Sequence, residues 1–184
     1  MIASSPEGAS SPARGARARG RLGFRAGAWV WLRAGLVLVC VVALDQLTKH
    51  LVEHSIVPGE QRKFLPGIQF VYTRNRGVAF GFFPGNHVAV TILVSLALVV
   101  LLAYFALHLA TPLIWLPTGM IAGGALGNVL DRVRHGSVTD FIKLPLGWPP
   151  FNLADTSITV GILILFVVID RTRNPQQHAR DDDS

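Results

Sequence analysis

The stretch VAVTILVSLALVVLLAYFAL, residues 88–107, is 20 residues long and contains no charged side chain. A helix needs about 20 such residues to cross the hydrocarbon core of a bilayer. Three other blocks of similar length are also apolar, at approximately residues 29–52, 109–130 and 152–170. Ordinary soluble domains do not carry so many blocks of this kind. The sequence therefore predicts an all-α polytopic membrane protein with four transmembrane helices.

The composition agrees with this prediction and argues against a nucleic-acid partner. Of the 184 residues, 51% are hydrophobic and only 15% are charged. No basic motif is interleaved with aromatic residues, as nucleic-acid-binding segments often require. The formal net charge is +6, and six arginines before or at the start of the first apolar block already account for six positive charges: Arg14, Arg17, Arg19, Arg21, Arg25 and Arg33.

These arginines orient the predicted helices, because positive residues accumulate on the cytoplasmic side of membrane proteins. Four spans place both termini on that side, so the connections 53–87 and 133–151 lie outside. The predicted organisation is a disordered, arginine-rich cytoplasmic tail (1–25), a four-helix transmembrane unit (26–170) and a second disordered cytoplasmic tail (171–184). A cleaved signal peptide competes for the first block, but the helical pattern continues past residue 43 and three more spans follow.

The first outer connection contains the segment GIQFVYTR, residues 67–74. Large apolar and polar side chains alternate along it, which is typical of a strand. We therefore expect a small extracytoplasmic β-sheet element in this loop.

Polar residues that are costly inside a bilayer gather on one side of the membrane in this topology. They lie at the outer ends of the first, third and fourth blocks and in the two outer connections. They are Asp45, Lys49, Asn75, Asn128, Asp131, Arg132, Asp140, Asn152 and Asp155.

Among these residues, Asp155 can pair with a second carboxylate. The segment from Asp140 to Asp155 contains three prolines, so it cannot span the membrane and must return on the same side. Two close carboxylates do not easily both ionise, which supplies an acid and a base for activating water. Spacing alone does not choose between Asp131 and Asp140 as the partner of Asp155.

Each feature also has a purely structural interpretation. Asp155 fits a helix N-cap, and Asp45 with Lys49 fits an interfacial ion pair. Asp131 fits an ion pair with Arg132 and Arg134. The glycines at 119, 123 and 127 are typical of close helix packing. His50 and His54 are four residues apart, but no metal site is expected, and there is no serine hydrolase, zincin or P-loop motif.

Four sequence blocks resemble a known family. They are DQLTK (45–49), NRGVAFG (75–81), GGALGNVLDRVRHGSVTDFI (123–142) and FNLADTSITVG (151–161). In order and membrane position they are similar to the signature blocks of the lipoprotein signal peptidases, or signal peptidases II. This resemblance implies an aspartic endopeptidase of the bacterial plasma membrane that cleaves diacylglyceryl-modified prolipoproteins just before the lipidated cysteine. It implies membrane lipids as surroundings, no cofactor and no obligate protein partner.

The resemblance also assigns roles to single residues. It implies Asp140 and Asp155 as the catalytic pair, on the outer side of the membrane. The implied supporting residues are Asp45, Lys49, Asn75, Asn128, Arg132, Asn152 and Ala154. The chain departs mildly from the family pattern at Val78, Thr139 and Thr156, where alanine, valine and serine are common.

Two other functions remain open from the residues alone. A small proton-coupled transporter would use intramembrane carboxylates, but it predicts acids through the membrane depth and internal symmetry, and neither is found. A non-enzymatic membrane scaffold would use the aspartates only as helix caps and ion pairs.

Overall fold

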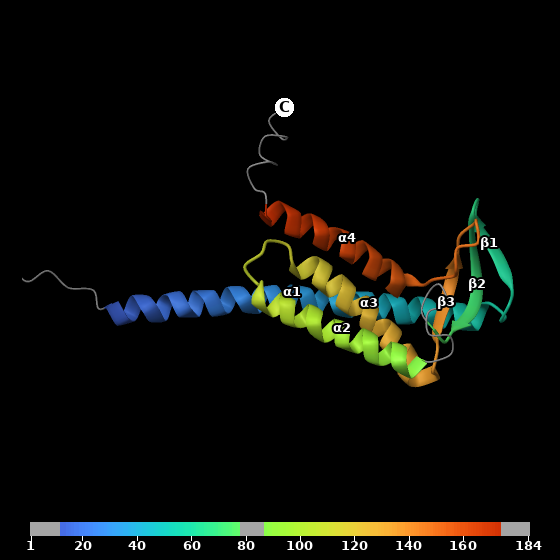
Figure 1. Ribbon diagram of the computed structural model, residues 1–184, viewed down its shortest axis with the longest axis horizontal. Coiled ribbons are helices and arrows are strands. Elements are labelled where there is room, and N and C mark those ends of the chain that lie inside the picture. The colour runs from blue at the N-terminus through green and yellow to red at the C-terminus, as the bar shows by residue number, and fades with distance from the viewer. Residues whose placement is uncertain (1–11, 78–86, 174–184) are drawn as a thin grey trace, which may run out of the picture.

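The computed structural model describes residues 12–77 and 87–173, with only the backbone helix given for 12–26. The elements follow in the order α1 (Pro12–Ser55), β1 (Gln61–Leu65), β2 (Ile68–Asn75), α2 (His87–Leu107), α3 (Trp115–His135), β3 (Val138–Lys143) and α4 (Leu153–Arg173). The four helices run alongside one another, and the three strands form one antiparallel sheet at one end of the bundle (Figure 1). We call this the sheet end; α1 and α3 end there, and α2 and α4 begin there.

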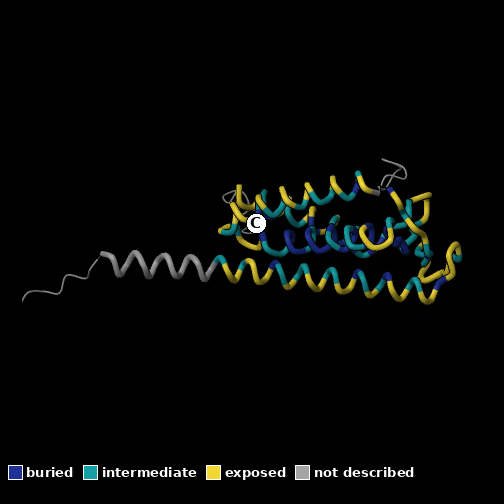
Figure 2. The backbone as a smooth tube through the Cα atoms, turned by 90° about the horizontal axis from the view of Figure 1, so that it is seen from below, coloured by how far each residue is buried: buried dark blue, intermediate teal, exposed yellow. Residues whose placement is uncertain are grey.

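Helix α3 is the centre of the bundle, because α1, α2 and α4 all pack against it. Its residues are the most buried of the molecule, while α1 and α2 leave long exposed faces (Figure 2). Three helical segments are long and apolar enough to cross a membrane: Gly27–Ser55, Val88–Leu107 and Leu153–Arg173. Of the four expected transmembrane helices, α1, α2 and α4 are thus apolar enough to span, and α3 is not among these segments. Other parts of the protein cover much of α3, so small and polar residues can occupy it.

The bounds of α3 also differ from the predicted block 109–130. Residues 108–114 form turns in which Leu113 adopts a left-handed conformation with φ 60°, so the helix starts only at Trp115. It then continues to His135 and carries Asn128, Asp131 and Arg132 in its last two turns. These polar residues are thus part of the helix that the others surround.

Glycines allow the close packing of α3 that the sequence predicted. A Cβ atom at Gly119 would lie 2.6 Å from the carbonyl oxygen of Ala34, on α1. A Cβ atom at Gly124 would lie 2.5 Å from the carbonyl oxygen of Ala154, on α4. Both distances are shorter than any van der Waals contact, so only glycine fits. The helix axes therefore approach closely enough for short polar side chains at the sheet end to reach one another.

The ends of the chain differ in part from the predicted tails. Helix α1 begins at Pro12, inside the segment 1–25 that was expected to be disordered, and α4 continues to Arg173. Alanine and arginine, which are frequent between 12 and 25, are strong helix formers. Residues 1–11 and 174–184 lie outside the described residues, as do Val78 and the remainder of the NRGVAFG block.

The sheet brings the two connections of the sheet end together. The predicted strand is β2, and β1 precedes it in the same connection, but β3 comes from the second connection and was not predicted. Strands β2 and β3 pair Thr73 with Asp140 and Arg74 with Thr139. Since side chains alternate along a strand, Asp140 lies on one face of the sheet and Thr139 on the other.

Candidate active site

The start of α4 holds Asp155 in a capping box. The backbone N–H of Asp155 donates to Asn152 Oδ1 at 2.9 Å, and the N–H of Asn152 donates to Asp155 Oδ2 at 3.2 Å. Asn152 is therefore the N-cap and Asp155 the third residue of the helix. The sequence-based assignment of the cap to Asp155 is wrong, because the helix begins at Leu153.

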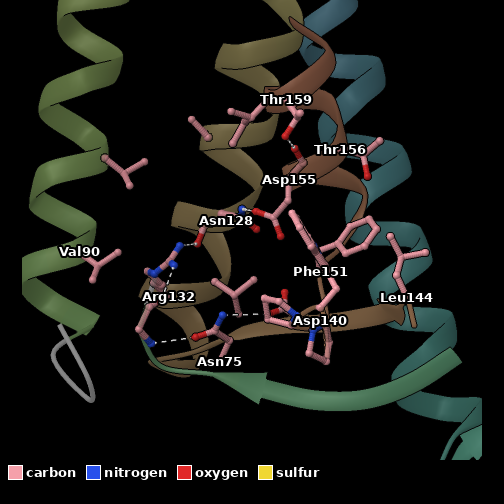
Figure 3. A pocket seen from close by; sticks show the side chains of 18 of the residues that line it. Asn75, Val90, Asn128, Arg132, Asp140, Leu144, Phe151, Asp155, Thr156 and Thr159 are labelled. Carbon is pink, nitrogen blue, oxygen red and sulfur yellow. Dashed lines mark hydrogen bonds between the residues drawn. The ribbon is translucent and has the colours of Figure 1, made fainter. Parts of the chain in front are cut away.

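Asp140 lies opposite, on β3, and asparagines hold both of its oxygens. Asn152 Nδ2 donates to Asp140 Oδ1 at 2.7 Å, and Asn75 Nδ2 donates to Asp140 Oδ2 at 2.9 Å. Asp140 is only 3% exposed. Asn152 thus contacts the carboxylates of both Asp140 and Asp155. Figure 3 shows these two carboxylates on two walls of one cavity.

Asn128 on α3 connects this pair to a buried charge. Its Nδ2 donates to Asp155 Oδ1 at 2.8 Å, and its Oδ1 accepts from Lys49 Nζ at 3.0 Å and from Asn152 Nδ2 at 3.2 Å. An ammonium group can only donate, so Lys49 forces the amide oxygen of Asn128 toward itself and the amide nitrogen toward Asp155. Lys49 therefore fixes the orientation of a side chain that binds the carboxylate.

The ammonium of Lys49 lies between two buried carboxylates. Its Nζ is 2.7 Å from Asp45 Oδ2 and 2.8 Å from Asp131 Oδ2. Asp45 Oδ1 also accepts from the backbone N–H of Ala154 at 3.0 Å, which ties α1 to the start of α4. The predicted pairing of Asp45 with Lys49 is therefore present, and it is buried inside the protein.

Asp131 lies in this network and does not line the cavity of Asp140 and Asp155. Its predicted pairing with Arg132 or Arg134 is replaced by the ion pair with Lys49. Gln46 Nε2 also donates to Asp131 Oδ1 at 2.9 Å, a contact that was not predicted from the sequence. The position of Gln46 directly after Asp45, inside the DQLTK block, was the only available signal.

Arg132 lies at the cavity wall and is 92% buried, with 8% of its surface exposed. Its guanidinium donates to the carbonyl oxygens of Asn128 at 3.2 Å and Gly77 at 3.1 Å. Among the described residues, its Nε has no hydrogen-bond partner. Arg132 thus joins α3 to the end of β2.

The cavity has a volume of about 530 Å³ and a largely apolar wall. Residues of α2, α3, α4 and the segment after β3 form that wall: Val90, Val94, Ala125, Leu144, Trp148, Pro149, Pro150, Phe151, Ile158 and Val160. It extends to Thr159 and Val160, which are exposed on the outer face of α4. Within residues 12–77 and 87–173, no three or more His, Cys, Asp or Glu side chains are grouped to hold a metal ion.

The surroundings of Asp140 keep its carboxyl protonated at unusually high pH. Burial raises the pKa of Asp140 from 3.8 to about 7, and the negative charge of Asp155 acts in the same direction. The amides of Asn75 and Asn152 offset part of this effect. A carboxylic acid beside a carboxylate is the combination that acid–base catalysis on an amide requires.

This pKa predicts a pH dependence of stability. Between pH 3.8 and about 7 the folded state binds the Asp140 proton and the unfolded state does not. Stability from this group is therefore complete at low pH and is lost as pH rises through the folded-state pKa. We expect the Tm of the wild type in detergent to fall more steeply between about pH 4 and 8 than that of Asp140→Asn. Parallel curves for the two proteins would contradict the raised pKa.

The chain is similar to known proteins in sequence. Residues 37–170 match the family model of signal peptidase (SPase) II. The chain is 43% identical over 136 residues to the lipoprotein signal peptidase of Syntrophomonas wolfei, covering 72% of this chain and 91% of the relative. It is 35% identical over 135 residues to the lipoprotein signal peptidase of Halothermothrix orenii, covering 73% and 92%.

The fold is similar to that of a solved structure. A bacterial membrane enzyme determined by the in meso method at 2.3 Å superposes with a TM-score of 0.68 and 32% sequence identity. The match covers 77% of this chain and 90% of that one. The sequence and fold similarities, over most of the length of each protein, show that this chain belongs to the signal peptidase II family.

Proposed function

We propose that this membrane aspartic peptidase removes the signal peptide of diacylglyceryl-modified prolipoproteins, with Asp140 and Asp155 as its catalytic pair. The observation that carries the proposal is the placement of both carboxylates on one largely apolar cavity, each held by asparagine side chains. The family supplies the substrate class, because the relatives are lipoprotein signal peptidases.

The proposed reaction uses the two carboxyl groups in different protonation states. Asp155, as the carboxylate, takes a proton from water, and the water oxygen bonds to the scissile carbonyl carbon. Asp140 gives its proton to the carbonyl oxygen, which produces a gem-diol. The gem-diol then returns a proton to Asp140, Asp155 protonates the leaving nitrogen, and the C–N bond breaks. The pKa of about 7 supports Asp140 as the initial acid.

The supporting residues keep this pair in place. Asn128 binds the carboxylate of Asp155. Asn152 binds one oxygen of Asp140, and Asn75 binds the other. Asp45 and Lys49 orient Asn128 and the start of α4, where Ala154 contributes its backbone N–H. Arg132 joins α3 to the end of β2 at the cavity wall.

The cavity also suits a substrate held in lipid. Its apolar wall between α2 and α4 ends at Thr159 and Val160 on the exposed face of an apolar helix, so an acyl chain can enter from the side. In the proposed orientation both termini are cytoplasmic and the sheet end is extracytoplasmic, which follows from the arginines at the start of the chain. Water then reaches the carboxylates from the outer surface.

The dependence on lipid tests this function. Purified protein is given one precursor sequence in two forms, with and without the diacylglyceryl group on the cysteine. We expect the lipidated form to be cleaved and the other form to be cleaved poorly or not at all, with cleavage followed by mass spectrometry. Equal cleavage of both forms would contradict the substrate assignment.

A further inference from the structure

Glu53, near the end of α1, contacts the strand that carries Asp140 from the face opposite the cavity. Thr139 Oγ1 donates to Glu53 Oε1 at 2.6 Å, and Arg74 NH2 lies 3.1 Å from the same oxygen. Thr139 precedes Asp140 on β3, and Arg74 is its partner on β2. One carboxylate oxygen of α1 therefore binds both strands.

The two faces of this strand pair have separate contacts. On the cavity face, Asn75 and Asn152 bind the carboxylate of Asp140. On the other face, Thr139 is 1% exposed, so its hydroxyl needs an acceptor within the protein, and the half-buried Glu53 provides it. The position of the Asp140 backbone is thus fixed from both sides.

We propose that Glu53 is a positioning residue of the reaction, acting through Thr139 to set the distance of Asp140 from Asp155. This inference rests on the proposed catalytic role of Asp140. Small displacements of a reacting group cost large factors in rate, whereas binding of the substrate elsewhere in the cavity is unaffected. Loss of the contact is therefore expected to lower kcat and to leave KM nearly unchanged.

The hydrogen bond and the ion pair do not contribute equally. The side chains of Glu53 and Arg74 are 23% and 34% exposed, so water screens their ion pair. The hydrogen bond from Thr139 is short, ends on a charged acceptor and starts from a buried donor, which makes it the stronger contact. The decisive substitutions are therefore at Thr139.

Valine and serine at position 139 separate hydrogen bonding from packing. Thr139→Val keeps the shape of the side chain and removes the donor, while Thr139→Ser keeps the donor and removes a methyl group. Valine is common at this position in the family, but in this chain it would leave Glu53 Oε1 without the hydrogen bond that Thr139 donates. We therefore expect kcat to fall roughly tenfold or more in Thr139→Val and to stay within about twofold of the wild type in Thr139→Ser. If the residue only fills space, the order of the two variants is reversed, and this result would overturn the proposal.

Variants of Glu53 complete the test. Glu53→Ala should lower kcat at least as much as Thr139→Val, and adding Thr139→Val to it should cause little further loss. Glu60→Gln is the matched control, because Glu60 pairs with Arg62 beside the same sheet and has no contact with β3 in the described structure. If the fold-decreases in kcat of Glu53→Ala and Thr139→Val multiply in the double variant, Glu53 does not act through Thr139. An equally large decrease in kcat in Glu60→Gln would also contradict this role.

Asp140→Asn is measured in the same assay. If it retains turnover, the catalytic assignment of Asp140 is wrong. If it is inactive while Thr139→Val has the kcat of the wild type, the catalytic assignment stands and only the role of Glu53 is refuted.

Discussion

Replacing either Asp155 or Asp140 by asparagine is expected to abolish cleavage, with kcat lower by about 10²–10⁴-fold or more. Asparagine has nearly the same shape as aspartate, but it can neither take a proton from water nor supply one to the carbonyl oxygen. The rate of cleavage of a lipidated precursor, measured with purified variants in detergent, gives this result directly.

Asp131→Asn is the informative comparison for these two variants. Asp131 is also a buried aspartate of the same end of the bundle, but it contacts Lys49 and Gln46 and does not line the cavity. We expect this variant to lose stability and to retain measurable turnover in the fraction that folds. Near-normal turnover in Asp140→Asn or Asp155→Asn would show that the pair has been assigned to the wrong residues.

The second large effect is expected from Lys49→Met. This substitution keeps most of the side-chain volume but leaves Asp45 and Asp131 as buried carboxylates without their common counter-ion. Removing one partner of a buried ion pair costs on the order of 3–5 kcal/mol, and here two carboxylates lose their partner. The Tm in detergent should fall strongly, and the remaining folded protein should have a low kcat because Asn128 loses the donor that orients it.

A double variant that removes one of the two carboxylate charges provides a check on this explanation. If the loss comes from the two carboxylates, Lys49→Met together with Asp45→Asn should be more stable than Lys49→Met alone. Lys63→Met is the matched control, because Lys63 lies on the exposed strand β1. The Tm of this variant should equal that of the wild type. A double variant that is less stable than Lys49→Met would contradict the electrostatic explanation.

The sequence predicted the helices well where lipid dictates the composition. The block 88–107 and helix α2, which runs from His87 to Leu107, agree closely, because a lipid-exposed helix must be apolar over its whole length. Helix α3 was placed too early along the chain, since the turn at Leu113 and the packing against three helices are tertiary features. Strand β3 was missed for the same reason: it is held by pairing with β2, about 65 residues earlier in the chain.

The polar residues of the site were found from the sequence, but their arrangement was not. Their gathering at one end followed from counting spans. Spacing alone left Asp131 and Asp140 as equal partners for Asp155, and the fold separates them by turning Asp131 toward Lys49. The bridging role of Asn152 and the contact of Thr139 with Glu53 depend on distances between segments that no local pattern encodes.

The composition of α3 has a consequence for biogenesis. A segment that is insufficiently apolar and ends with Asn128, Asp131 and Arg132 gains little from partitioning into lipid during insertion. Its place in the bundle therefore depends on contacts with the other helices, among them the ion pair of Asp131 with Lys49 and the close approach of its glycines to α1. The contacts that orient the carboxylates are thus also contacts that compensate for the lower apolar character of α3.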